Sequence, residues 1–563
     1  MKKERIILVA TAIGVAFGAV AQSLNKEIKV ERDIVPEYRD ADRLPLSPVI
    51  SLPSVTRQNL NYSLVDRPVG VTPSVFTLGL HHPSYIGEEI YPGYAVLGYM
   101  PKFNAVASLG YRFLNTEKTT LGAWMQYNGR SYHPIGVMYV IPGKDTRDNY
   151  TEHAASVGVN LIHATGENSK LSGLMDYTYS HRNFHGKEGV NNLNLSLQWD
   201  KGAQEDVSYG IGGGFSRFAF INGSEWYKYL IGTYKLVPVR QNKFDLSGEV
   251  SKAFSTTSKV FLGMDFSYLH SSMSDFFVES DKQTLYYGDN LSFGSTTSNT
   301  WLLRFTPGYH YAVHDFTMDL GVKVDLTHGS GKAFHIAPDV KVAYTPSSFF
   351  GVEINAGGGE VQNTAAALYN EMPYMAQYTA FQNSHIPFTL DGTMVFGPFK
   401  GGYFEIFGGY AKANNWIMPF KDAIDLEGVD VSGWHAGVTA GYRCGKKFEA
   451  KVSAEFASSS DDIKHTYYLW RDRARYVIDV NAKWSPIEKL DITLGYMLRG
   501  KRKMESSFDL GSFSSFQLGA AYKINPHISV FLDGQNLFNH ANFYIGGVPA
   551  QGITGLAGVT LKF

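Results

Sequence analysis

Two short segments have residue types that could do chemistry, but neither has the spacing which that chemistry needs. Gly329-Ser330-Gly331-Lys332 has part of a phosphate-loop pattern, yet Ala333 stands where Ser or Thr should follow and the glycine spacing is wrong. Gly214-Phe215-Ser216 lacks the following glycine of a nucleophile elbow. We therefore expect an outer turn at Gly329–Lys332, no catalytic residues, and a protein that is not an enzyme.

A metal or cofactor site is not indicated either. His81 and His82 with Glu88 and Glu89 are residue types that bind metal ions, but such a cluster is more often a solvated loop, which we favour. The single cysteine, Cys444, excludes an internal disulfide scaffold and a cysteine-cluster metal site. The formal charge of −1 gives no indication of nucleic-acid binding.

One aromatic segment is a candidate binding surface. Residues 365–381 contain several aromatic side chains, and three of them have the i, i+4, i+7 spacing that a short helix would align on one face. Such a face could cap a lumen, contact a sugar or peptide ligand, or dock a surface lipoprotein, although we favour simple packing against a wall. The candidate residues for this loop are Tyr369, Tyr374, Tyr378 and Phe381.

The elements that would position these residues are strands. Residues 448–456 place apolar side chains at even positions and charged or polar side chains at odd positions, and residues 490–499 repeat the pattern. The last strand, at residues 551–563, also alternates and ends on Phe563. An apolar side opposite a small or polar side is the pattern of a strand between lipid and a wet lumen.

The connections between these strands alternate in length. Short turns fall near residues 115–118, 200–203, 443–446, 485–488 and 525–526, and longer connections fall near residues 133–149, 271–296, 360–386, 413–430, 458–471 and 536–550. Short periplasmic turns and long outer loops are typical of outer-membrane barrels. The sequence thus predicts an all-β fold, a transmembrane antiparallel barrel of about 22 strands, with both chain ends in the periplasm.

The N-terminus differs from the rest. Residues 1–21 have a charged start, a short apolar stretch and an Ala-x-Ala site, as in a secretory signal peptide. Residues 22–75 are broken by prolines and read as an extended segment, and residues 76–563 as the barrel. We expect the chain in the outer membrane, in contact with lipid and lipopolysaccharide. The charged residues expected to face the lumen mix both signs, unlike the single-sign rings of a selective pore.

The C-terminus resembles the ending of TonB-dependent outer-membrane receptors. That family closes its barrel with an Asn-Leu-Phe-Asn turn, a Gly-x-Pro-x-x-Gly approach and a terminal aromatic strand, although Ile553 stands where the family often has Arg. The matching residues are Asn536, Leu537, Phe538, Asn539, Gly547, Pro549, Gly552 and Phe563. Residues 30–36, ending at Pro36, are similar to a segment ahead of plugless, receptor-like barrels of Bacteroidetes-type bacteria.

The resemblance implies a receptor or transport barrel that moves or binds a ligand across the outer membrane, with Phe563 as a handle for the insertion machinery. The chain departs from this family because we expect no folded plug domain. Residues 22–75 or a long loop must therefore fill the lumen. Ile28, Val30 and Pro36 are candidate periplasmic contacts, with TonB as one possible partner. The alternative is a membrane anchor or binding module whose N-terminal segment docks a periplasmic or surface-lipoprotein partner.

Overall fold

The structure is a computed structural model, and the chain divides into two compact units, Met1–Leu60 and Asn61–Phe563. All of the residues that it describes belong to the second unit: 91–100, 104–135, 149–183, 188–202, 207–221, 239–272, 297–329, 331–371, 382–420, 425–461, 474–505, 508–544 and 549–563. The expected signal peptide, the segment 22–75 with Ile28, Val30 and Pro36, and the cluster at 81–89 lie outside these residues.

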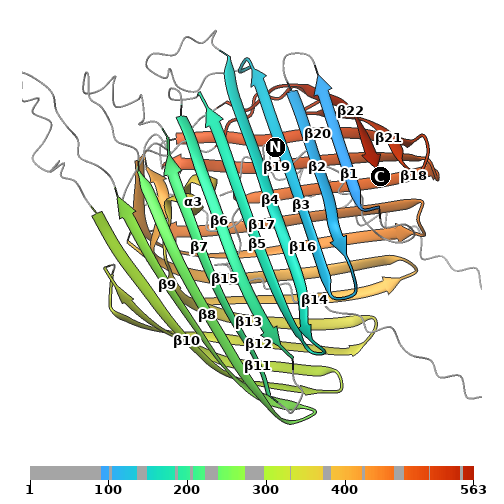
Figure 1. Ribbon diagram of the computed structural model, residues 1–563. Helices are drawn as coiled ribbons and strands as arrows, with labels where there is room; N and C mark the ends of the chain where they lie inside the picture. Colours follow the sequence, from blue (N-terminus) through green and yellow to red (C-terminus); the bar gives the residue numbers. More distant parts are fainter. Residues whose placement is uncertain are drawn as a thin grey trace, which may run out of the picture. The chain divides into compact units, whose positions relative to one another are not determined.

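The described chain forms 22 strands, as expected, and each pairs antiparallel with the next (Figure 1). The first eleven are β1 Gly93–Met100, β2 Asn104–Asn115, β3 Thr119–Tyr132, β4 Tyr150–Gly166, β5 Ser169–Arg182, β6 Glu188–Lys201, β7 Val207–Phe220, β8 Arg240–Ser255, β9 Ser258–Ser272, β10 Thr297–Val313 and β11 Phe316–His328. The others are β12 Phe334–Ser347, β13 Phe350–Val361, β14 Ser384–Phe399, β15 Gly402–Phe420, β16 Asp425–Cys444, β17 Phe448–Asp461, β18 Tyr476–Ile487, β19 Leu490–Glu505, β20 Phe508–Lys523, β21 Ile528–Gln535 and β22 Thr554–Lys562.

The sheet closes because the first and last strands pair with each other. β1 runs antiparallel to β22 from Tyr94 opposite Lys562 to Tyr99 opposite Ala557. The amide of Gly93 donates to the carbonyl of Phe563 at 2.8 Å, and the amide of Phe563 donates back at 3.0 Å. A closed sheet satisfies its backbone hydrogen bonds without leaving an edge, which a bilayer requires.

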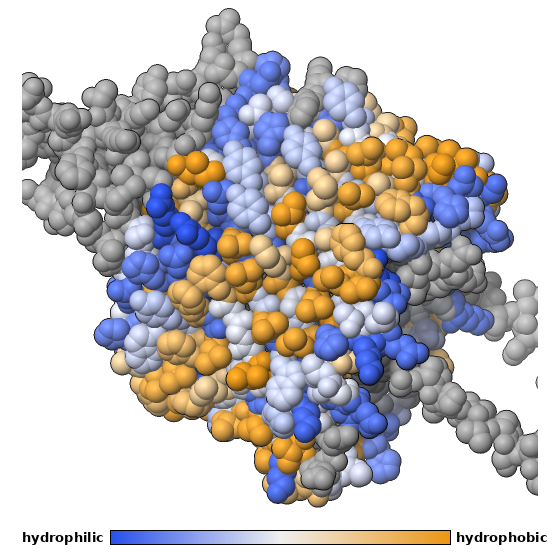
Figure 2. All heavy atoms as spheres, in the orientation of Figure 1, coloured by the Kyte–Doolittle hydropathy of each residue, from blue (hydrophilic) through white to orange (hydrophobic). Residues whose placement is uncertain are grey.

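The outer face of the barrel is apolar. In β17, Val452 faces outward and is 45% exposed, while Glu455 on the other face is buried. Phe563 directly follows β22 and is 49% exposed, while Leu556 on the other face of that strand is buried. Figure 2 shows hydrophobic residues over much of the exterior of the front strands, with hydrophilic residues mostly toward the edges. The expected alternation between lipid and lumen is therefore confirmed.

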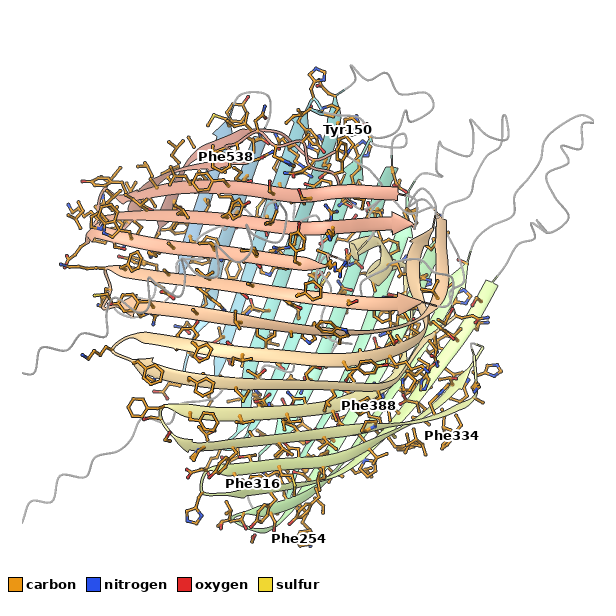
Figure 3. The ribbon with its side chains drawn as sticks, turned by 180° about the vertical axis from the view of Figure 1, so that it is seen from behind. Tyr150, Phe254, Phe316, Phe334, Phe388 and Phe538 are labelled. Atoms are coloured by element: carbon orange, nitrogen blue, oxygen red, sulfur yellow. The ribbon has the colours of Figure 1, made fainter. Side chains whose placement is uncertain are left out.

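The connections between strands differ in length at the two ends of the barrel. One, the short-turn end, has tight turns such as those at 115–119 and 313–316, and it also holds both ends of the barrel chain. The other, the long-loop end, has the connections 133–149, 221–239, 273–296, 362–383, 462–475 and 536–553. Exposed aromatic residues lie near the short-turn end, as expected for a membrane interface, and Figure 3 labels one of them, Phe254. The set is Tyr111, Phe113, Phe254, Phe349, Phe399, Tyr442, Trp484, Tyr522 and Phe563.

A single helix, α3 Ala365–Glu371, is present among the described residues, in the connection between β13 and β14. It is too short and too polar to cross a bilayer, and the described part of the chain has no helix that could.

Candidate functional site

The connection that carries α3 is hydrogen-bonded to the wall of the barrel. The side chain of Gln362 accepts a hydrogen bond from Ser267 on β9 at 2.8 Å and donates to Thr300 on β10 at 3.0 Å. The amide of Ala365, at the start of α3, donates to the side chain of Gln241 on β8 at 2.6 Å. Residues 362–365 thus extend from β13 to the strands β8–β10.

The helix is packed into the largest buried apolar cluster among the described residues. Ala365, Leu368 and Tyr369 share this cluster with Phe218 and Phe220 of β7, and its other members are Val190, Val239 and Ile417. Ile417 belongs to β15, which is separated from β7 by β8–β14 in the ring of strands. The α3 segment, residues 362–371, therefore joins two distant parts of the wall at the long-loop end (Figure 1).

Tyr369 is the aromatic anchor of this packing. Its ring lies 5.6 Å from those of Phe218 and Phe220, and the Arg182 guanidinium is 5.1 Å from its centroid. Burial raises the pKa of Tyr369 to about 12, although Arg182 opposes the rise. The phenol is therefore neutral at any physiological pH. Tyr374, Tyr378 and Phe381, the other candidates in this loop, lie outside the described residues.

Two clusters of opposite charges lie on the inner wall of the barrel. Arg304 on β10 contacts Asp325 on β11 through two hydrogen bonds of 2.7 and 2.9 Å. His435 on β16 lies between Asp391 and Glu455, 3.1 Å from each. Both clusters mix positive and negative groups, which agrees with the expected hydrated lumen and differs from a ring of one sign.

A third cluster contains three residues that the sequence had not singled out. His335, Glu360 and His385 lie together on β12, β13 and β14 at the foot of the α3 segment. Each stands in a different strand, 25 positions from the next, so no short motif joins them. Only the alternation of each strand could have indicated that they face inward.

The C-terminal motif forms the connection between β21 and β22 and its supports. Asn536 has a φ of 46°, and its buried side chain donates to the carbonyl of His540 at 2.9 Å and accepts from the His540 amide at 3.0 Å. Asn539 accepts a hydrogen bond from the Ile553 amide at 2.9 Å. Leu537 packs near Gly534. Phe538 is 71% exposed, and its ring stacks on the ring of Phe516.

The rest of the motif fixes this connection to the wall. The carbonyl of Pro549 accepts a hydrogen bond of 3.0 Å from the hydroxyl of Tyr132 on β3. A Cβ at Gly552 would lie 2.4 Å from Ile135, so only glycine fits there without a shift. Gly547 lies outside the described residues. The described residues of the motif thus form a turn and attach it to the wall beside β3.

The two segments that have motif-like residues are ordinary barrel elements. Gly329 and Gly331, both at positive φ, belong to the connection between β11 and β12, as expected. Ser216 lies within β7, and its neighbour Phe215 packs on Phe244 of β8. Neither segment has the turn into a helix that a phosphate loop or a nucleophile elbow requires.

A closed 22-strand antiparallel barrel with an apolar exterior has the architecture of an outer-membrane barrel. The chain is similar to the FrpB iron transporter from Neisseria meningitidis, with a TM-score of 0.66, 11% identity, and coverage of 85% of this chain and 82% of that one. It is similar to a mutant of the ferric enterobactin receptor PfeA from Pseudomonas aeruginosa (TM-score 0.63, 11% identity, coverage 85% and 81%).

A third similar structure is the copper transporter OprC, with a TM-score of 0.62, 11% identity, and coverage of 85% of this chain and 80% of that one. No protein-family model matches the chain, and no curated protein sequence matches it. At this identity the likeness establishes the fold alone. The barrel expected from the resemblance to TonB-dependent receptors is thereby confirmed.

Proposed function

We propose that this chain is an outer-membrane receptor that takes up a polar ligand through its lumen, with the α3 segment, residues 362–371, narrowing the passage. The observation that carries the proposal is the packing of Leu368 and Tyr369 in one cluster with β7 and β15. A membrane anchor needs only an apolar exterior. It has no need of a connection that is fixed by buried hydrogen bonds across the inner wall.

The charges of the inner wall support a polar ligand. The Arg304–Asp325 ion pair and the His435–Glu455 contact place polar groups on the inner wall at positions that a purely structural core would fill with apolar side chains. The similar structures include an iron transporter, a ferric enterobactin receptor and a copper transporter. A metal ion or metal chelate is therefore the first cargo to test.

The narrowing role is tested by conductance of the full chain in planar bilayers. The double variant L368A/Y369A removes the two side chains that anchor α3, and Y369F is the matched control because it keeps the ring. We expect a larger single-channel conductance for the double variant and an unchanged conductance for Y369F. Equal conductance of all three proteins would contradict the proposal.

Energy coupling through TonB is part of the proposal and is supported by the C-terminal resemblance. Residues 28–30 are the candidate contact, and a proline there would prevent the strand pairing that such a contact uses. We expect I28P or V30P to abolish uptake of radiolabelled iron chelates while the barrel remains in the membrane. Deletion of residues 22–75 that leaves uptake intact would contradict this coupling. Unchanged conductance of the same deletion variant would contradict a role of that segment as the gate.

A further inference from the structure

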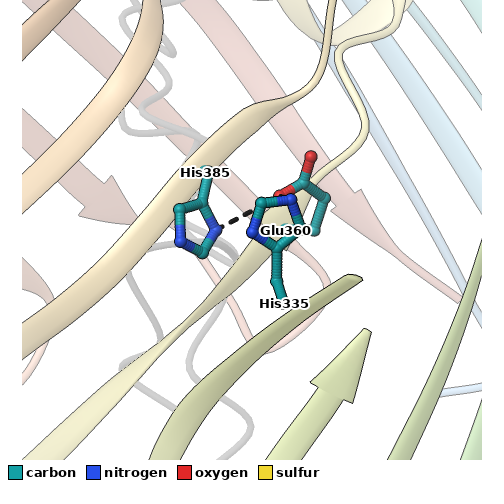
Figure 4. A group of neighbouring side chains, drawn as sticks. All are labelled: His335, Glu360 and His385. Carbon is teal, nitrogen blue, oxygen red and sulfur yellow. Dashed lines mark ion pairs between the residues drawn. The ribbon is translucent and has the colours of Figure 1, made fainter. Parts of the chain in front are cut away.

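Three metal-ligating side chains converge where β12, β13 and β14 reach the long-loop end (Figure 4). His335 Nε2 lies 3.4 Å and His385 Nδ1 lies 3.2 Å from the same oxygen, Oε2 of Glu360. The side chain of His335 is 9% exposed, that of His385 is 19% exposed and that of Glu360 is 2% exposed. The cluster is therefore nearly dry.

These three atoms lack the hydrogen bonds that buried polar groups require. Among the described residues, Nε2 of His335, Oε2 of Glu360 and Nδ1 of His385 are buried and have no hydrogen-bond partner. A buried carboxylate without compensation is costly, so such an arrangement needs a positive charge at its centre. The two imidazole rings lie side by side, with centroids only 4.0 Å apart, so both face the same carboxylate oxygen.

The spacing of the atoms suits a shared cation. A transition-metal ion bonds to His nitrogen and Glu oxygen at about 2.1 Å, so two of its ligand atoms lie about 3.4 Å apart in a tetrahedral site and about 3.0 Å apart in an octahedral one. The distances of 3.4 and 3.2 Å from the two histidine nitrogens to Glu360 Oε2 lie in this range. All three ligand atoms lie within 4.8 Å of one another.

The main chain of Glu360 is fixed independently of its side chain. Its amide donates to Asp325 at 2.6 Å, and its carbonyl accepts from Arg304 at 2.8 Å. The main chain that carries the carboxylate is consequently held in place before any ion arrives. Preorganised ligands of this kind favour tight binding because little ordering remains to be done on association.

We propose that His335, Glu360 and His385 bind one divalent transition-metal ion, for which Zn²⁺ is the probe. Two imidazoles and one carboxylate are ligands for Zn²⁺ and Cu²⁺ and disfavour Mg²⁺ and Ca²⁺. Three protein ligands leave a coordination position open to water or to a donor group of another molecule. A bound ion also ties the ends of β12, β13 and β14 together beside Gln362, where the α3 segment begins.

The test is calorimetric titration of the full-length, untagged chain in detergent with Zn²⁺. We expect one equivalent to bind, and we expect H335N, E360Q and H385N each to weaken binding by more than about 100-fold, since loss of a second-shell group alone costs about 10–100-fold. The spectrum of bound Cu²⁺ should show coupling to two imidazole nitrogens, and to one in either histidine variant.

His435 gives the matched control. It is also a histidine flanked by two carboxylates on the inner wall, but both of its ring nitrogens are already in hydrogen bonds, so H435N should leave the Zn²⁺ affinity unchanged. Circular dichroism checks that each variant retains its barrel. Equal Zn²⁺ affinity in the wild type and all three ligand variants, or no stoichiometric binding, would overturn the site.

This inference goes beyond the proposed function and stands apart from it. Zn²⁺ binding is measured on the purified chain without any transport step. A barrel that binds Zn²⁺ but has unchanged conductance in L368A/Y369A would contradict the narrowing role and keep the metal site. A barrel that does not bind Zn²⁺ but has a larger conductance in L368A/Y369A would contradict the metal site and support the narrowing role.

Discussion

Arg304 on β10 holds the main chain of Glu360 on β13. Its Nη2 atom donates to the Glu360 carbonyl at 2.8 Å while the same guanidinium contacts both carboxylate oxygens of Asp325. Asp325 in turn accepts the Glu360 amide. One ion pair therefore joins three strands, β10, β11 and β13, where the α3 segment leaves the wall.

This arrangement predicts that Asp325→Asn is strongly destabilising. It removes the carboxylate that hydrogen-bonds to the largely buried Arg304 guanidinium, and breaking a buried pair costs about 3–5 kcal/mol. We expect the free energy of unfolding in urea to fall by about that amount. We also expect faster amide hydrogen exchange in residues 360–371. Arg443→Gln is the control, because Arg443 and Glu449 are a largely exposed pair and its loss should cost less than about 1 kcal/mol. Similar losses for the two variants would contradict the role given to Asp325.

Tyr369 should titrate at unusually high pH. Burial raises its pKa to about 12, above the ordinary value of 10.0, so the folded state favours the neutral phenol. The resulting stabilisation is fully present below pH about 10 and is lost as the pH rises through about 12. The difference in tyrosinate absorbance between the wild type and Y369F should be absent near pH 10 and appear near pH 12. A difference that is complete by pH 10.5 would show that this ring is not buried.

Asn536 should be sensitive to both backbone strain and lost hydrogen bonds. Asn536→Gly removes its side-chain bonds to His540 but accepts the φ of 46°, whereas Asn536→Ala loses the same bonds and adds strain of about 1–2 kcal/mol. We expect stability to decrease in the order wild type, N536G, N536A, measured by unfolding in urea. If N536A were as stable as N536G, the positive φ would not be a constraint.

Phe563 is expected to matter for assembly more than for packing. Its backbone pairs with Gly93, and its half-exposed ring stacks on Tyr111 at 6.2 Å. If the terminal ring is a handle for the insertion machinery, Phe563→Ala should lower the amount of folded barrel in the membrane several-fold. Phe538→Ala removes a ring that is more exposed and should have little effect. Equal membrane levels of the two variants would contradict the handle.

Several features of the fold were predictable because they depend on local pattern. The alternation in residues 448–456 and 490–499 indicated β17 and β19 and their apolar faces, and the alternating loop lengths indicated the strand number. The segment at 365–381 was expected to pack on the wall, and Tyr369 does so. That α3 lies in one cluster with β7 and β15 could not be foreseen, because nothing local specifies which distant strands a connection meets.

The sequence by itself predicted a membrane barrel, since a period of two is a property of each strand alone. Only the tertiary structure decided that His335, Glu360 and His385 converge. A slip of two residues between neighbouring strands keeps every side chain on its face but moves it by about 7 Å along the strand. The alternation therefore places each of the three residues on the inner wall, and the register of β12, β13 and β14 brings them within reach of one ion.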